Sequence, residues 1–177
     1  MDIILQYKLL KLLSMKKITL LLVFIGMMTL QSCEVNDTVD NDTISEVFEV
    51  TTSFNSNNNY SRLVAFNPPI YSSDVVLVYH LYDTVNGEDI WKLMPQTYYF
   101  SDGGELDFNF DYTKNNVNIF LSANFSLNTL PSSWTQDQTF RIAIIPANFA
   151  TTVNKNNIDA VMAALKVNKT EIQKINL

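Results

Sequence analysis

The sequence is poor in residue types on which many active sites and covalent links depend. It has one cysteine, one histidine and four glycines in 177 residues. A single cysteine cannot form an intrachain disulfide, so packing must stabilise the fold. A lone histidine, His80, argues against a hydrolytic triad and against a zinc site, and we expect it to be a hydrogen-bonded core residue. Gly103-Gly104 lies between two expected strands and not before a helix, which argues against a phosphate-binding loop. We therefore expect no cofactor.

Positive charge is also scarce. The chain carries 12 basic and 18 acidic side chains, which gives a net charge of −6. Residues 34–177 alone hold 8 basic and 17 acidic side chains, a net charge of −9. An acidic surface repels phosphate backbones and anionic lipid headgroups. We expect no nucleic-acid partner and no attachment to a membrane by charge alone.

The most apolar stretch, Ile18 to Leu30, is too short to be a transmembrane helix, which needs roughly 20 apolar residues. It follows Met15-Lys16-Lys17 and ends in Leu30-Gln31-Ser32-Cys33, directly before a polar, acidic stretch. Its apolar side chains would point all around a helix, as in a signal peptide or a deeply buried helix. The lysines before it and the polar stretch after it favour the signal peptide.

This order of basic head, short apolar segment and small residue before a lone cysteine resembles the signal of bacterial lipoproteins. The chain thus resembles the small lipid-anchored proteins of bacterial outer membranes. The resemblance implies that residues 1–32 are cleaved off and that Cys33 carries the lipid. It further implies a cell-envelope location, on the periplasmic or the surface side. We expect translation to begin at Met15, and a start at Met1, with an unusually long head that carries Lys8 and Lys11, is the alternative.

Residues 33–45 contain the lipidated cysteine and an acidic tether without apolar periodicity. Residues 46–177 then form a single β-rich domain. Three tripeptides resemble the Asp-Thr-aliphatic acceptor for O-glycosylation in some outer-membrane bacteria. Their threonines are Thr38, Thr43 and Thr84.

Alternating apolar residues, β-branched residues and aromatics predict a mainly β fold, either an antiparallel β-sandwich or a meander sheet, with a C-terminal α-helix. The expected strands include 46–54, 60–66, 74–82 and 139–145, and the expected helix covers 158–166, with Asn157 as its N-cap. A short last turn is expected around 170–175.

Three turns, at 86–87, 101–104 and 113–116, predict a four-stranded antiparallel meander over residues 74–124. Its apolar side chains share one face, and Pro95 would occupy a bulge or a non-bonding position. The turns predict these cross-strand pairs: Tyr82 with Trp91, His80 with Leu93, Tyr99 with Leu106, Thr97 with Phe108, Tyr112 with Val117, and Phe110 with Ile119.

Two features of this meander are candidate sites. The first is a group of carboxylates, Asp102, Glu105, Asp107 and Asp111, of which strand neighbours two apart lie about 7 Å from each other. They could form a glycosidase pair, a surface calcium site or a plain solvated face. The second is a set of aromatics opposite the core face, Tyr98, Phe100 and Phe120, beside Tyr79. They would stack on sugar rings if that face is open, and they would be core if a second sheet from 46–66 and 139–145 covers it.

The function we expect is that of a non-enzymatic binding or assembly module, which is held at the envelope by its lipid and contacts a protein or a glycan. The alternative is a glycan-acting hydrolase that uses the carboxylates around Glu105 and Asp107. A cleft that holds two carboxylates would favour the enzyme, and an exposed row without a pocket would favour the module. The oligomeric state does not follow from the sequence.

Overall fold

The computed structural model describes residues 46–177. These residues belong to one compact unit. The predictions for Cys33, Thr38, Thr43, the signal peptide and the tether fall on residues 1–45, outside the described part of the chain. Among the residues described, no helix is long and apolar enough to cross a membrane.

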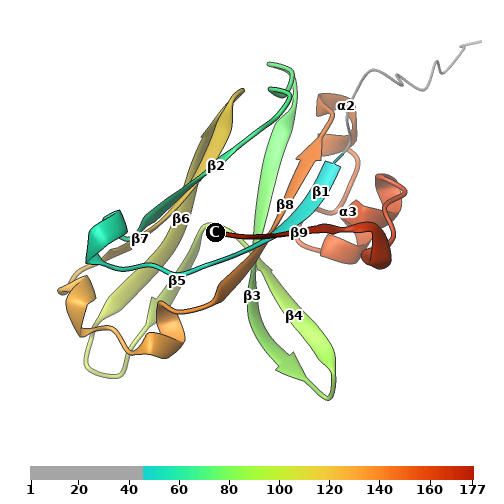
Figure 1. The fold of residues 1–177 in the computed structure, drawn as a ribbon. Helices are drawn as coiled ribbons and strands as arrows, with labels where there is room; N and C mark the ends of the chain where they lie inside the picture. The colour runs from blue at the N-terminus through green and yellow to red at the C-terminus, as the bar shows by residue number, and fades with distance from the viewer. Residues whose placement is uncertain (1–45) are drawn as a thin grey trace, which may run out of the picture. The chain divides into compact units, whose positions relative to one another are not determined.

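Residues 46–177 form two packed β-sheets with a helical segment near the C-terminus, so the prediction of a β-sandwich with a C-terminal helix is confirmed (Figure 1). The five-stranded sheet has the order β4 (Glu88–Leu93), β3 (Val75–Val85), β8 (Gln138–Ile145), β1 (Glu46–Thr52) and β9 (Gln173–Asn176). The four-stranded sheet has the order β2 (Ser61–Ala65), β7 (Asn116–Ala123), β6 (Glu105–Thr113) and β5 (Gln96–Tyr99). The helices are α2 (Ala147–Ala150) and α3 (Ile158–Ala164), and the 3-10 turns are η1 (Ser56–Asn58), η2 (Leu127–Thr129), η3 (Ser132–Trp134) and η4 (Lys169–Glu171).

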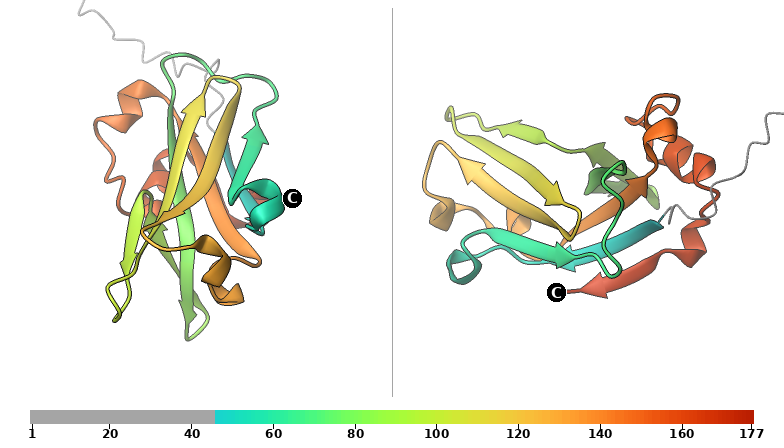
Figure 2. Two further views of the ribbon diagram at one scale, coloured as in Figure 1. Left: turned by 90° about the vertical axis from the view of Figure 1, so that its left-hand side faces the viewer. Right: turned by 90° about the horizontal axis from the view of Figure 1, so that it is seen from above.

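The main core lies between the two sheets, where inward-facing side chains of alternate positions meet. Phe54, Phe108 and Phe140 are almost fully buried there, and Phe54 contacts the other two rings edge to face at 6.4 and 6.0 Å. The two layers are seen from above in Figure 2. Aromatic packing therefore stabilises a core that no intrachain disulfide can reinforce.

A second apolar cluster covers the outer face of the five-stranded sheet. Leu77 and Tyr79 of β3 pack there in one cluster with Val161 and Met162 of α3. The N-terminus of α3 is capped as predicted, because the Asn157 side chain accepts a hydrogen bond from the Ala160 amide at 3.1 Å. Strand β8 and the first half of β3, Val76 to His80, are therefore buried on both faces, which explains their near-continuous apolar sequences. The end of β3, from Tyr82 to Val85, is exposed.

The predicted four-stranded meander is wrong. Strands β3 and β4 belong to one sheet and β5, β6 and β7 to the other, so the chain crosses between sheets at Met94-Pro95. Pro95 lacks an N–H for a ladder, and here it lies between two strands instead of in a bulge. The expected second sheet is divided in the same way: β1 and β8 join β3, while β2 joins β7.

The hairpins also correct two predicted registers. Asn86-Gly87 makes the two-residue turn, with positive φ at both residues, but the pairing shifts by one residue between Leu81 and Asp83. Leu81, and not Tyr82, therefore lies opposite Trp91. In the next hairpin Tyr98 pairs with Leu106 and Tyr99 with Glu105, which is a slip of one residue from the prediction. The β6–β7 register is confirmed, with Tyr112 opposite Val117 and Phe110 opposite Ile119.

The C-terminal residues form a strand that the sequence pattern did not predict. Around the expected last turn, the chain forms η4 and then β9, which pairs in parallel with β1. Parallel strands are joined by a long connection and not by a hairpin turn, so no turn motif in the sequence indicates the pairing of β9 with β1.

Candidate functional site

The four carboxylates singled out in the sequence do not form a metal cluster. Asp107 accepts a hydrogen bond from the Thr97 hydroxyl at 2.6 Å and from the Ser122 hydroxyl at 3.4 Å, so its partners are neighbouring strands and not another carboxylate. Asp102 accepts from the Gly104 amide at 3.0 Å within its own loop. Glu105 and Asp111 are exposed on β6. No group of three or more His, Cys, Asp or Glu residues that could hold a metal ion occurs within residues 46–177.

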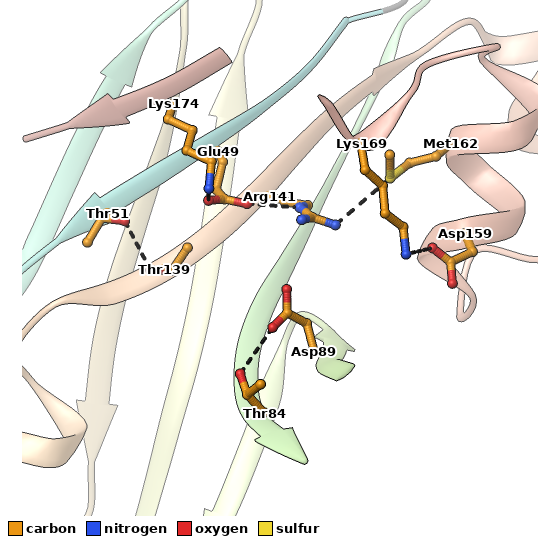
Figure 3. Close-up of polar contacts among 10 residues, drawn as sticks. All are labelled: Glu49, Thr51, Thr84, Asp89, Thr139, Arg141, Asp159, Met162, Lys169 and Lys174. Carbon is orange, nitrogen blue, oxygen red and sulfur yellow. Dashed lines mark hydrogen bonds and ion pairs between the residues drawn. The ribbon is translucent and has the colours of Figure 1, made fainter. Parts of the chain in front are cut away.

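Thr84, a predicted glycosylation site, is exposed near the tip of the β3–β4 hairpin. Its hydroxyl donates to the Asp89 carboxylate at 3.0 Å (Figure 3). The threonine is therefore accessible, and its hydroxyl is held by a neighbouring carboxylate.

The aromatic face predicted from the meander does not exist as one surface. The register slip turns Tyr98 inward, where it is buried, and leaves Tyr99 75% exposed. Tyr79 lies under the helical segment, and its hydroxyl donates to the Lys155 carbonyl at 2.6 Å. Burial raises the pKa of Tyr79 above its ordinary value. Phe100 packs against the main core.

A different aromatic site lies where β3 passes the η3–β8 segment. We call it the Tyr82–Trp134 hollow; it has a volume of about 400 Å³. That size falls in the range of small-molecule sites. Its lining comes from two stretches far apart in sequence: His80, Leu81, Tyr82 and Asp83, and then Ser133, Trp134, Asp137, Gln138 and Thr139.

Three aromatic rings support this hollow. Tyr82 is 45% exposed and stacks on the buried Tyr98, with centroids 5.7 Å apart and planes 7° from parallel. The half-buried Trp134 also contacts Tyr98, and the centroids of these two rings are 4.8 Å apart. The Lys92 ammonium lies 3.4 Å from the centroid of Tyr82, a cation–π contact. Tyr98 thus holds both lining rings in place.

His80 and Gln138 form the polar floor of the hollow. His80 Nε2 lies 3.0 Å from Gln138 Oε1, and His80 Nδ1 lies 3.3 Å from the Tyr98 hydroxyl. Because Gln138 Oε1 can only accept, Nε2 carries the proton and Nδ1 accepts from Tyr98. Burial, which outweighs the bond to Gln138, lowers the pKa of His80 to about 4. The prediction of a satisfied core histidine is confirmed.

The polar side chains of the lining are engaged to different degrees: Asp83 Oδ1 accepts a hydrogen bond from the Thr84 amide at 2.8 Å. The Gln138 amide donates to the carbonyls of Ser133 and Gln136, at 3.1 and 2.7 Å, so both ends of this side chain are engaged. Asp83, Ser133 and Asp137 are exposed in the lining. The hollow therefore presents aromatic faces beside two carboxylates and a hydroxyl.

A second hollow, of about 560 Å³, lies between the β3–β4 hairpin and α3 and is lined in part by Trp91 and Arg141. Arg141 Nε donates to Glu49 at 3.0 Å, and the guanidinium carbon lies 4.1 Å from the Trp91 ring centroid. Lys169 in the same lining is paired with Asp159 at 3.0 Å (Figure 3). Because its cations already have acidic partners, this hollow is the weaker candidate.

Sequence reasoning missed the residues of this hollow as site residues: Tyr82, Asp83, Ser133, Trp134 and Asp137. The only signal was Trp134 itself, a large aromatic in a loop. No protein-family model, no curated protein and no solved structure matches this chain.

Proposed function

We propose that this protein is a lipid-anchored cell-envelope module that binds a carbohydrate in the Tyr82–Trp134 hollow without transforming it. The observation that carries the binding role is that Tyr82 and Trp134 line one hollow together with two exposed carboxylates, Asp83 and Asp137. The signal-like sequence that ends at Cys33 supports the envelope location.

Carbohydrates match such a lining for two reasons. The C–H faces of a sugar ring are apolar and pack on aromatic rings, while hydroxyl groups around its edge donate to carboxylates. Ligand sites in general combine aromatic walls with a few oriented polar groups. The rings here are supported from behind by Tyr98, which lowers the entropic cost of holding them for a ligand.

The hydrolase alternative has less support. It depended on Glu105 and Asp107. Asp107 accepts hydrogen bonds from the Thr97 and Ser122 hydroxyls on the outer face of the four-stranded sheet. Neither of these carboxylates lines the Tyr82–Trp134 hollow. Release of reducing ends from a bound oligosaccharide would nevertheless favour the enzyme.

Replacing Cys33 by serine should move the protein from the membrane fraction to the soluble fraction of the envelope, because serine lacks the sulfur that the lipid requires. Fractionation of cells that express each form, with metabolic labelling by a fatty-acid analogue, measures this. An unlabelled wild-type protein, or an unchanged distribution of the variant, would contradict the anchoring.

Replacing Trp134 by alanine should weaken oligosaccharide binding about twofold to tenfold, since one stacked ring contributes roughly 0.5–1.5 kcal/mol. Isothermal titration of residues 46–177 with short glucan, glucosamine and N-acetylglucosamine oligomers measures the affinity. Because Trp134 also contacts Phe100 and the buried Phe108, a variant at the 45% exposed Tyr82, Tyr82→Ala, provides a second test.

The matched control is Tyr99→Ala, which removes a ring that is 75% exposed and lies outside the hollow. It should bind as the wild type does. Equal binding by Trp134→Ala, Tyr82→Ala and the wild type would exclude this hollow as the site.

A further inference from the structure

We propose that the Tyr82–Trp134 hollow selects a protonated amino sugar over neutral and N-acetylated sugars. This inference rests on the proposed carbohydrate binding and names the ligand class of the same site. It depends on the charges around the hollow and on how its aromatic rings already hold an ammonium group.

The lining is acidic. Asp83 and Asp137 are its charged residues, and no lysine or arginine belongs to it. Both aspartates are exposed, so they remain accessible to a ligand that enters from solvent. His80 uses both ring nitrogens within the protein and is neutral. A carboxylated or sulfated sugar would meet like charges here, whereas an ammonium group would meet opposite ones.

Lys92 lies over the Tyr82 ring, and its position shows how these rings accommodate a cation. Its ammonium lies 3.4 Å from the Tyr82 centroid and 5.1 Å from the Tyr98 centroid. The face of an aromatic ring attracts a cation through its quadrupole. Lys92 offsets one of the two aspartates, so Asp83, Asp137 and Lys92 together keep a net charge of −1. The stacked tyrosines are therefore compatible with an ammonium group, and the surrounding charge still favours one.

An amino sugar joins the two kinds of contact that the hollow offers. Its ring faces can pack on Trp134 or Tyr82, and its ammonium group can form a charge-assisted hydrogen bond with a rim aspartate. Acetylation of the amine removes the charge and leaves the ring unchanged. The N-acetyl sugar is therefore the matched probe for the charge alone.

The experiment compares three oligosaccharides of equal length and linkage by isothermal titration: β-1,4-linked glucosamine, N-acetylglucosamine and glucose. It uses residues 46–177 at a mildly acidic pH, where the amine is protonated and aspartates are ionised. We expect the glucosamine oligomer to bind at least tenfold more tightly than the other two. Asp83→Asn combined with Asp137→Asn should bring the three affinities to within about threefold. Glu105→Gln combined with Asp111→Asn, which removes two exposed carboxylates of β6 from outside the lining, should leave the preference intact.

Each outcome separates this inference from the proposed function. Equal binding of the three sugars that depends on Trp134 would overturn the selectivity and leave carbohydrate binding standing. Binding of none of them would contradict both. A glucosamine preference that survives the Asp83→Asn and Asp137→Asn changes would arise from the general acidity of the domain, and it would overturn the assignment to this hollow.

Discussion

Replacing Glu49 by alanine should lower the free energy of unfolding by about 3–5 kcal/mol, the usual cost of leaving one partner of a buried ion pair alone. Glu49 lies directly opposite Arg141 across β1 and β8, and their side chains are only 10% and 9% exposed. Without Glu49, the Arg141 guanidinium would stay between Trp91 and α3 without an acidic partner. Urea unfolding, followed by tryptophan fluorescence, measures the loss.

Two variants isolate the cause. Lys174 also contacts Glu49, at 3.0 Å, but its side chain is 73% exposed, so Lys174→Ala should cost at most about 1 kcal/mol. The double change Glu49→Leu with Arg141→Met removes both charges and should recover most of the stability that Glu49→Ala loses. A loss below about 1 kcal/mol for Glu49→Ala would show that Arg141 is well solvated without its partner.

Acidification should destabilise this protein through His80. Burial lowers the pKa of His80 to about 4 in the folded protein, from 6.5 when unfolded. Between these values the unfolded chain binds a proton that the folded chain does not bind. The stabilisation is therefore complete above pH 6.5 and is lost as the pH falls toward 4, by about 3 kcal/mol in total.

A His80→Gln variant tests this pH dependence. The variant lacks the titrating ring. Between neutral pH and pH 4, its free energy of unfolding should therefore fall by about 3 kcal/mol less than that of the wild type. The comparison uses the two pH slopes, because the substitution also alters the contacts with Tyr98 and Gln138 and so changes stability at neutral pH. Parallel slopes would mean that His80 titrates normally in the folded protein.

The candidate site shows why local patterns could not locate it. The hollow joins residues 80–83 with residues 133–139, and these stretches meet because β3 and β8 are neighbours in one sheet. Two one-residue irregularities then decide which rings line and support it: the shift in β3 at Tyr82 and the slip that turns Tyr98 inward, behind the lining. A register change of one residue moves a side chain to the opposite face of the sheet. Because Tyr98 and Tyr99 are both aromatic, apolar alternation does not determine which of the two faces the core.

The sequence by itself determined the local elements of this protein. Period-two alternation predicted β6, Asn86-Gly87 predicted the turn of the β3–β4 hairpin, and Asn157 with the apolar stripe that follows it predicted α3, because each depends on neighbouring residues. Only the tertiary structure decided which strands share a sheet, that the chain changes sheets at Pro95, and that β9 pairs with β1. Strand partners are chosen by packing between segments far apart in the chain, and alternation specifies a strand's two faces but not its neighbours.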